Sequence, residues 1–340
     1  MTNSRGLRLL CLDGGGVRGL VQLSVLRNLK RRTNKEPHEL FDLLCGSGTG
    51  GILAMLLGLL KVPVDECEEL YEKLAKEVFE VGWLHNPNSP VSDLASDLGA
   101  DRARHSSKAL ERCMKEAIQL RGHAPGLRLS EVAPDPTHPR PTPRVFVVAR
   151  RGQSAHLFRN YDDTIDAGAA GTHDACVWEA ARATSATPEL FEPVKIGRHR
   201  YVDGGLGHNN PTPDALTELS RIGAWKDHPI ACIVSLGTGI KTINTVGGVG
   251  DIPRLLPRLL IDTATDCEAT HQHLENQRHG SGDYFRFNVS EGVGDFGLDG
   301  TKLIPAMIEA TQAHLARRTV IDSLEKVWSR LVEASNSASL

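Results

Sequence analysis

Short apolar runs alternate with longer amphipathic stretches along this chain, and that alternation constrains the possible fold more than any other feature. Strands that are buried on both faces need continuous apolar runs, whereas helices that cover a sheet carry apolar residues at helical spacing. We therefore predict an α/β fold of three layers, α/β/α, in which helices lie on both faces of a mostly parallel central sheet.

The positions of these runs predict the individual elements. Short, mostly apolar runs predict strands over residues 7–12, 41–45, 144–149, 155–158, 201–202, 230–235 and 284–287. Helical spacing predicts helices over residues 18–30, 52–60, 64–79, 175–184, 257–273, 304–316 and 319–334. Nothing in the sequence marks a second domain, so we expect a single domain over 1–340, with its core at about 7–290 and extra C-terminal helices at about 300–334.

Prolines recur between residues 124 and 144, at positions 125, 134, 136, 139, 141 and 143. Proline interrupts both helices and sheets because it lacks the backbone N–H and its ring fixes φ. We predict that 124–144 is an exposed connecting loop.

Charge and hydrophobicity exclude two classes of function. The formal net charge is −3, from 39 basic and 42 acidic residues, whereas a nucleic-acid-binding domain usually carries a strongly basic surface. The longest apolar run, 52–60, is much shorter than the roughly 18 residues of a membrane-spanning helix. We therefore expect no nucleic-acid partner, and any membrane contact is expected to be peripheral.

The cysteines and the N-terminus indicate a cytoplasmic protein. Seven cysteines, an odd number, are widely spaced in apolar stretches and form no C-x-x-C pair. They are expected to be buried reduced thiols, without a zinc site. The first residues lack the zones of a secretory signal.

The first candidate site is the glycine-rich loop from Asp13 to Gly19, between a predicted strand and a predicted helix. Consecutive glycines let backbone N–H groups approach a ligand oxygen closely, at the positive end of the following helix. That arrangement suits an oxyanion or a phosphate. The alternative is a tight turn that needs glycine only for steric reasons.

The second candidate site is the stretch Gly46–Gly51, with sequence GSGTGG. In the nucleophile elbow G-x-S-x-G, flanking glycines relieve crowding around a residue whose hydroxyl projects from a strand-to-helix corner. The flanks here are Gly46 and Gly50. The central residue is Gly48, which has no side chain.

The third candidate site is Asp203-Gly204-Gly205, at the end of a predicted strand. Two glycines leave the carboxylate of Asp203 accessible to a neighbouring group, so it can accept a proton from a hydroxyl. The alternative is an aspartate that caps a turn.

The order of these motifs resembles the patatin-like phospholipase family, in particular its fungal members and the calcium-independent phospholipases A2. Three further stretches agree with the family: 157–161 (LFRNY), 181–186 (ARATSA) and 235–239 (SLGTG). The resemblance covers about residues 7–240. It implies a patatin-like three-layer fold that hydrolyses acyl esters of phospholipids or neutral lipids with a Ser-Asp dyad and no calcium.

The resemblance also implies roles for individual residues. Asp203 is then the base of the dyad, and position 48 is that of the nucleophile. Backbone donors for the oxyanion come from Gly14, Gly15 and Gly16. Arg18 orders that loop or meets a phosphate. No metal or organic cofactor is needed, because the aspartate supplies the base and the amides stabilise the negative charge.

Glycine at position 48 removes the covalent mechanism, since no acyl-enzyme forms without a hydroxyl at the corner. Ser47 is not expected to replace it, because only the central side chain of an elbow is presented by the turn. We expect the Ser47 hydroxyl to bond nearby backbone instead. The chain is predicted to be an inactive variant, and both an engineered loss and a natural pseudoenzyme remain open.

Two other functions are considered. Gly46, Gly48 and Gly51 also satisfy the dinucleotide pattern G-x-G-x-x-G, which needs an acidic residue at the end of a second strand about 20 residues on. Asp65 and Glu66 lie near that distance but are expected to begin a helix. The other candidate is a lipid-binding or signalling module that keeps the pocket without turnover.

The histidines and one basic, apolar segment are the remaining candidates for a functional role. His271, His273 and His279 are expected to be exposed polar residues rather than metal ligands, because an i, i+2 pair points to different sides of a helix. His208 is a candidate lining residue for the site. The segment Arg254–Ile261 mixes basic and bulky apolar residues and is a candidate membrane contact.

Overall fold

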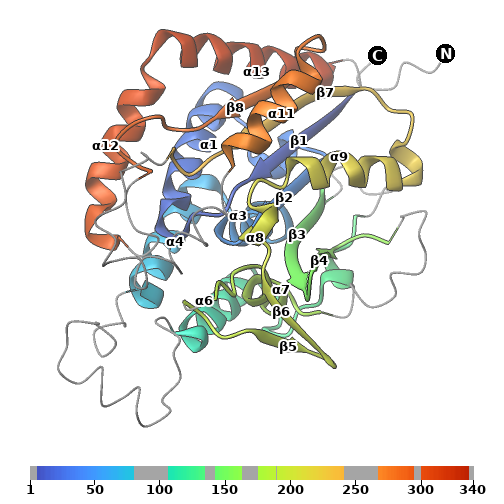
Figure 1. The fold of residues 1–340 in the computed structure, drawn as a ribbon, viewed down its shortest axis with the longest axis vertical. Helices are drawn as coiled ribbons and strands as arrows, with labels where there is room; N and C mark the ends of the chain where they lie inside the picture. Colours follow the sequence, from blue (N-terminus) through green and yellow to red (C-terminus); the bar gives the residue numbers. More distant parts are fainter. Residues whose placement is uncertain are drawn as a thin grey trace, which may run out of the picture.

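The computed structural model describes residues 6–79, 106–134, 142–162, 175–188, 190–240, 267–294 and 300–336. Eight strands of this part form one sheet, with helices packed against it (Figure 1). The strands are β1 (Leu7–Leu12), β2 (Leu43–Ser47), β3 (Arg144–Arg151), β4 (Ser154–Arg159), β5 (Val194–Ile196), β6 (His199–Asp203), β7 (Ile230–Leu236) and β8 (Tyr284–Phe287).

The described α-helices are α1 (Gly19–Thr33), α2 (Pro37–Leu40), α3 (Thr49–Ala54), α4 (Val64–Phe79), α6 (Ser107–Leu120), α7 (Val177–Thr184), α8 (Gly205–His208), α9 (Thr212–Arg221), α11 (Glu268–Arg278), α12 (Ile304–Leu315) and α13 (Arg318–Asn336). Shorter helical turns are η1 (Gly16–Arg18), η2 (Met55–Leu59), η4 (Leu129–Val132), η5 (Gly223–Trp225) and η7 (Thr301–Leu303).

The sheet is mostly parallel, as the sequence predicts. Its order is β5-β6-β3-β2-β1-β7-β8, with β4 paired to β3. Strands β3, β2, β1, β7 and β8 run parallel, whereas β4, β5 and β6 are joined through antiparallel pairs. The carboxyl ends of β1 and β2 are neighbours, because Leu12 pairs with Gly46. The loops that follow these two strands therefore start side by side.

Alternation along the strands divides the core into two layers. Leu10, Leu44 and Val234 face one side of the sheet, where they pack with residues of α1, α3, α4, α6, α7, α12 and α13. Leu9 and Cys45 face the other side, where they pack with residues of α9. Helices thus cover both faces, and the predicted three-layer α/β/α class is confirmed.

Several predicted boundaries are wrong by a few residues. The strand predicted at 41–45 is β2 at Leu43–Ser47, because Pro37–Leu40 forms a short helix whose capping box uses Glu36 and Glu39. The helix predicted at 52–60 begins at Thr49 and continues as the π-helical turn η2. Of the helix predicted at 257–273, residues 257–266 lie outside the described part, and α11 covers Glu268–Arg278.

Several elements have no counterpart in the prediction, among them α6, α9 and β5. Helix α6 does carry sequence signals, since the Ser106 side chain caps it by accepting the N–H of Ala109 at 3.1 Å. Leu110, Met114 and Ile118 then lie buried at helical spacing. Strand β5 has only three residues, too few for a periodic signal.

The remaining structural predictions have mixed outcomes. The chain on either side of residues 135–141, which lie outside the described part, is a loop apart from η4. All seven cysteines are free thiols; five are buried as predicted, whereas Cys176 and Cys267 are partly exposed. The candidate membrane segment 254–261 lies outside the described residues. None of the helices that the structure describes has the length and apolarity to cross a bilayer.

Candidate active site

The turn from β2 into α3 is a sharp elbow with Gly48 at its corner. Gly48 has φ +53° and ψ −123°, a conformation that favours glycine. A Cβ atom on Gly46 would lie 2.1 Å from the carbonyl oxygen of Gly50, and one on Gly50 would lie 2.2 Å from that of Leu12. The backbone therefore packs so closely that both flanking positions need glycine.

Thr184, the last residue of α7, fixes the orientation of this corner. Its Oγ1 accepts the N–H of Gly48 at 3.0 Å and donates to the carbonyl of Val148 in β3 at 2.6 Å. All three residues are buried. No local pattern in the sequence predicts this contact, since 136 residues separate Thr184 from Gly48.

Asp203 ends β6 and faces the corner. Strand β6 pairs with β3 through Ala149 and Asp203, and β3 lies next to β2, so the sheet carries Asp203 to the elbow. A Cβ atom built on Gly48 would lie 3.4 and 3.6 Å from the two carboxylate oxygens of Asp203, and 3.6 Å from Cα of Gly14. The three motifs singled out in the sequence therefore meet at one place.

Burial raises the pKa of Asp203 to about 6, although hydrogen bonds from Thr187 and from the N–H of Gly205 favour its charged form. Thr187 donates its hydroxyl to Oδ2, and the Gly205 N–H donates to Oδ1 at 2.7 Å. A carboxyl group with this pKa is mostly ionised at neutral pH and is a better proton acceptor than an ordinary aspartate.

The two glycines after Asp203 let the turn pack against β3. A Cβ atom on Gly204 would lie 2.2 Å from the carbonyl oxygen of Val148, and one on Gly205 would lie 3.1 Å from Oδ1 of Asp203. A side chain at Gly204 would collide with backbone, and one at Gly205 would crowd the carboxylate.

The loop after β1 places its glycines beside the elbow. The N–H of Gly14 donates to the carbonyl of Asn209 at 3.2 Å, whereas the N–H groups of Gly15 and Gly16 have no acceptor within the described residues. A Cβ atom on Gly14 would lie 2.3 Å from Oδ1 of Asn209, and one on Gly15 would lie 2.3 Å from Oγ1 of Thr238. The loop therefore offers two amide donors close to the corner.

Arg18 is buried and bonded to backbone carbonyls. Its Nε donates to Gly15 at 3.2 Å and its Nη1 donates to Gly294 at 2.9 Å. The hydroxyl of Tyr71 in α4 donates to the carbonyl of Gly16 at 2.7 Å. Of the two roles considered for Arg18, these contacts correspond to ordering the loop.

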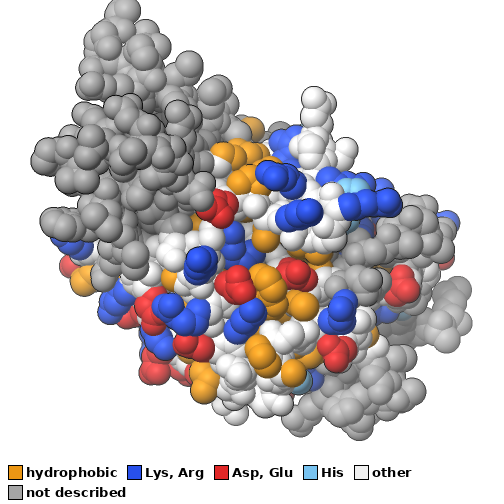
Figure 2. Space-filling model, turned by 90° about the horizontal axis from the view of Figure 1, so that it is seen from below, with side chains coloured by type: hydrophobic (Ala, Val, Ile, Leu, Met, Phe, Trp, Pro, Cys, Tyr) orange, Lys and Arg blue, Asp and Glu red, His pale blue; other side chains and the backbone are white. Residues whose placement is uncertain are grey.

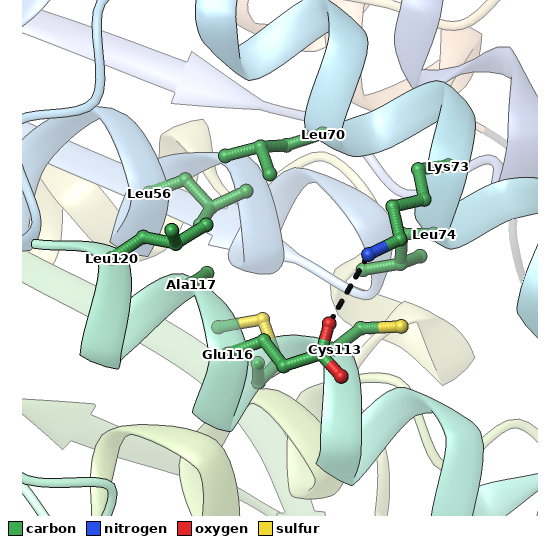
Figure 3. Close-up of a pocket in the computed structure, with 9 residues that line it drawn as sticks. Leu56, Leu70, Lys73, Leu74, Cys113, Glu116, Ala117 and Leu120 are labelled. Atoms are coloured by element: carbon green, nitrogen blue, oxygen red, sulfur yellow. Dashed lines mark hydrogen bonds and ion pairs between the residues drawn. The ribbon is translucent and has the colours of Figure 1, made fainter.

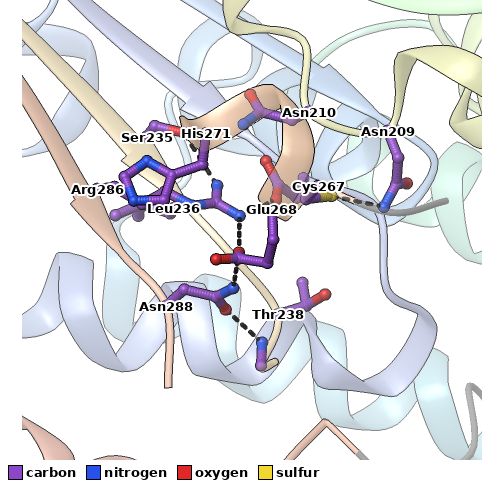
Figure 4. A network of polar contacts seen from close by, with 12 residues as sticks. Asn209, Asn210, Ser235, Leu236, Thr238, Cys267, Glu268, His271, Arg286 and Asn288 are labelled. Carbon is purple, nitrogen blue, oxygen red and sulfur yellow. Dashed lines mark hydrogen bonds and ion pairs between the residues drawn. The ribbon is translucent and has the colours of Figure 1, made fainter. Parts of the chain in front are cut away.

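A buried ion pair ties the first residue of the loop to β8. Nη2 of Arg286 lies 2.6 Å from Oδ2 of Asp13, and the two side chains are 4% and 1% exposed. Arg286 also donates to Ser235 at 3.0 Å. It lies 3.5 Å from Glu268 of α11, which accepts from Asn288 at 2.7 Å (Figure 4). The glycine loop thus depends on elements late in the chain, a link that the sequence does not indicate.

The predicted role of Ser47 is wrong. Its hydroxyl is fully buried and has no hydrogen-bond partner within the described residues. Because β2 pairs with strands on both sides, its neighbouring backbone carbonyls are already occupied. A Cβ atom on Gly204 would lie 3.0 Å from the Ser47 oxygen, so this hydroxyl lies under the turn that follows Asp203.

Two of the histidines considered in the sequence, His271 and His208, contact polar side chains. His271 Nδ1 lies 3.2 Å from the hydroxyl of Tyr284, and His208 Nδ1 lies 3.0 Å from a carboxylate oxygen of Asp214. Across the described part of the chain, no three His, Cys, Asp or Glu side chains form a group that could hold a metal ion.

The dinucleotide interpretation fails on topology. Asp65 and Glu66 lie in the first turn of α4, as expected, and not at the end of a strand. The next strand within the described residues is β3, which begins at Arg144. An acidic residue that could bind a ribose is therefore not placed as this fingerprint requires.

A separate apolar pocket lies between α4, α6 and η2 (Figure 3). Lys73 and Glu116 form an ion pair of 3.2 Å beside it. Its other lining residues are Leu56, Leu70, Leu74, Cys113, Met114, Ala117 and Leu120. None of these belongs to the three motifs, so this pocket is distinct from the candidate active site.

The fold and the site together define a class of protein. A strand-turn-helix elbow at the carboxyl edge of a parallel sheet, a buried carboxylate facing it and unpaired amides beside it form the arrangement used by acyl hydrolases. Comparison with known families agrees. The model of the patatin-like phospholipases matches residues 10–216, and the chain belongs to this family.

Individual relatives are consistent with this assignment. The chain is 39% identical over 299 residues to calcium-independent phospholipase A2-gamma of Rattus norvegicus, covering 84% of this chain and 35% of the relative. It is 29% identical over 346 residues to Phospholipase A I of Arabidopsis thaliana, covering 87% of this chain and 26% of that protein. The chain thus spans about a third or less of the length of these relatives.

Among solved structures, VipD from Legionella pneumophila aligns with a TM-score of 0.40 and 13% identity, over 91% of this chain and 67% of that chain. A likeness at this level carries no argument about function. The fungal subtype expected from the sequence stays a prediction.

Proposed function

We propose that this chain has the framework of a lipid acyl hydrolase in which Gly48 stands at the position of the nucleophile, so that the chain itself is inactive. The observation that carries the proposal is the direction of the missing side chain. A Cβ atom on Gly48 would point to within 3.4 Å of Asp203 and would lie in ordinary contact with it. A hydroxyl carried by that atom would therefore be within reach of a base.

The proposed reaction follows from the groups around the corner. With serine at position 48, the hydroxyl oxygen attacks the ester carbonyl while Asp203 takes its proton. The N–H groups of Gly15 and Gly16 stabilise the oxyanion, because the N–H of Gly14 is already bonded to Asn209. Collapse expels the alcohol, which recovers the proton from Asp203. Water, deprotonated by Asp203, then releases the fatty acid in the same way.

In the chain as it stands, the covalent step has no nucleophile. Serine proteases that lose a member of the triad keep an acceleration of roughly 10³–10⁴ over water, from the oxyanion hole and binding. Slow hydrolysis by a water molecule is thus the most activity that we expect. The proposal involves no metal or organic cofactor, and it includes a peripheral contact with membranes and a cytoplasmic location.

The test is to compare Gly48→Ser with the parent chain on a soluble short-chain ester. We expect Gly48→Ser to gain esterase activity and the matched Gly48→Ala to gain none. Because Asp203 must be ionised to accept the proton, the activity should rise with pH around a midpoint near 6 and level off above it. Adding Asp203→Asn to Gly48→Ser should abolish the gain. Ordinary esterase activity of the parent chain would contradict the proposal.

A lipid-binding module without turnover is the second candidate. The observation that favours it is a site that lacks only the hydroxyl while its surrounding contacts are intact. If Gly48→Ser folds, binds phospholipid vesicles and remains inactive, the module is the better account.

A further inference from the structure

An exposed basic hairpin lies at the edge of the sheet next to the candidate active site. Strands β5 and β6 form this hairpin, and β5 is the edge strand. Three of its basic side chains are exposed: Lys195, Arg198 and Arg200. None of the three forms an ion pair within the described residues. The hairpin therefore presents three cationic side chains that have no ion-pair partner in the part of the chain that the structure describes.

The neighbouring β-hairpin adds to this charge. Arg151 ends β3, is exposed and also lacks an ion pair within the described part. His156 of β4 packs on Tyr201 of β6, with ring centroids 5.0 Å apart, so the two hairpins touch. The pKa of His156 is lowered to about 4, first by burial and then by Arg151, Arg159 and His199.

Several basic residues elsewhere on the surface form ion pairs with acidic neighbours. On α4 and α6, Lys73, Arg112 and Lys115 pair with Glu116, Glu77 and Glu111. The chain as a whole has a net charge of −3. Figure 2 looks at the molecule from the side where β5 and β6 lie in Figure 1, and it shows blue side chains gathered together with a pale blue histidine.

The hairpin is connected directly to the candidate catalytic aspartate. Arg200 and Asp203 belong to the same strand, β6, three residues apart. A strand rises about 3.3 Å per residue, so the exposed arginine lies on the order of 10 Å along the strand from the carboxylate. A surface bound at the hairpin would therefore lie close to the elbow.

We propose that Lys195, Arg198 and Arg200, with Arg151, form a docking surface for membranes rich in anionic lipid, and we call this set the basic hairpin patch. The choice of a lipid surface rests on the proposed function, because the patch flanks a site for lipid esters. Anionic headgroups supply the complementary charge, and each basic side chain near such a surface strengthens binding about fivefold.

The test uses the full chain and two kinds of vesicle, one of phosphatidylcholine alone and one of equimolar phosphatidylcholine and phosphatidylserine. In a sedimentation assay, the parent should bind the anionic vesicles preferentially, and rising salt should weaken this binding. The triple variant Lys195→Gln, Arg198→Gln, Arg200→Gln should lose roughly 100-fold in partition coefficient.

A matched control removes the same charge elsewhere. Lys302, Arg318 and Lys326 are exposed and lie at η7 and α13, and α13 is at the opposite end of the molecule from β5 in Figure 1. Replacing these three by glutamine should leave vesicle binding within about twofold of the parent, because they do not belong to the basic hairpin patch and contribute only to the net charge.

Equal losses in the triple variant and the control would overturn the proposal, since they would reflect net charge alone. It would also be overturned if the folded, monomeric triple variant bound like the parent. Aggregation of that variant with unchanged vesicle binding would mean that the charges only protect an edge strand. The patch variant combined with Gly48→Ser should keep full activity on a soluble ester, so loss of docking and failure of the proposed reaction remain distinguishable.

Discussion

At Gly48, the surrounding space permits a side chain, whereas the backbone conformation disfavours one. Its surroundings leave room for a Cβ atom, with the nearest contact at 3.4 Å, but its φ of +53° is unfavourable for any other residue. Such backbone strain costs about 1–3 kcal/mol. We therefore expect Gly48→Ala and Gly48→Ser each to lower the free energy of unfolding by about this amount, measured by urea denaturation. Variants as stable as the parent would show that the corner is not strained.

Asp203 is held in a buried site that disfavours its charge. Its pKa rises from an ordinary value of 3.8 to about 6, so the folded protein holds the proton more tightly than the unfolded chain. Stability is therefore lost as pH rises from about 4 to about 6, and the penalty, about 3 kcal/mol, is complete above that range.

Asp203→Asn should remove this penalty. The variant is expected to be more stable than the parent by about 1–3 kcal/mol at pH 7.5, with the difference disappearing near pH 4. The gain in stability should not exceed the full penalty of about 3 kcal/mol. An asparagine amide has only one acceptor oxygen, so it cannot accept from both Thr187 and Gly205 as the carboxylate does. Thermal denaturation across that pH range is the measurement, and replacement of the exposed Asp227 by asparagine is the control for loss of a carboxylate. A parent more stable at pH 7.5 would contradict this account.

At the scale of elements, β8 and α11 support the loop that carries the amide donors. Arg286→Met would leave Asp13 buried without its partner, which typically costs about 3–5 kcal/mol. Asp13→Asn in the same protein should recover part of that loss, because it removes the unpaired charge. Urea denaturation of the two single variants and the double variant would measure the coupling.

An exposed ion pair serves as the comparison for this cycle. Arg318 is 83% exposed and lies 3.0 Å from Asp322, so Arg318→Met should change stability little. If the losses for Arg286→Met and Asp13→Asn simply add, the two residues do not act as a pair and the loop is held by other contacts.

The elements differ in how far the sequence predicts them. Helix α4 and strand β8 match their predicted bounds, because uninterrupted periodicity marks α4 and a short aromatic-rich run marks β8. Strand β2 begins two residues later than predicted, because Phe41 is the C-cap of the short helix α2. Helix α6 is absent from the prediction although its serine cap and spacing are present.

The residues of the candidate active site also differ in how far the sequence predicts them. The glycines and Asp203 could be named because glycine-rich turns leave a local pattern, which for Asp203 is the sequence Asp-Gly-Gly. Thr184, Thr187 and Arg286 could not, since their partners lie far away in the sequence and only the sheet register brings them together. The burial of Ser47 follows from the central position of β2, which no local pattern reveals.

Across the whole molecule, the candidate active site combines residues inside the family match with a supporting residue that lies C-terminal to it. The family model covers residues 10–216, which include the glycine loop, the elbow and Asp203. The partner of Asp13 lies beyond it, in β8. Strands β7 and β8 thus complete the sheet, and they also hold the glycine-rich loop that begins at Asp13.

In the proposed mechanism, position 48 is the site of covalent chemistry and lacks only a hydroxyl. A fluorophosphonate ester, which phosphonylates activated serines, tests it when the intact protein and its peptides are analysed by mass spectrometry. We predict one equivalent of label at position 48 in Gly48→Ser, little label when Asp203→Asn is added, and none in the parent. Labelling of the parent at Ser47, or an unlabelled but folded Gly48→Ser, would contradict the account.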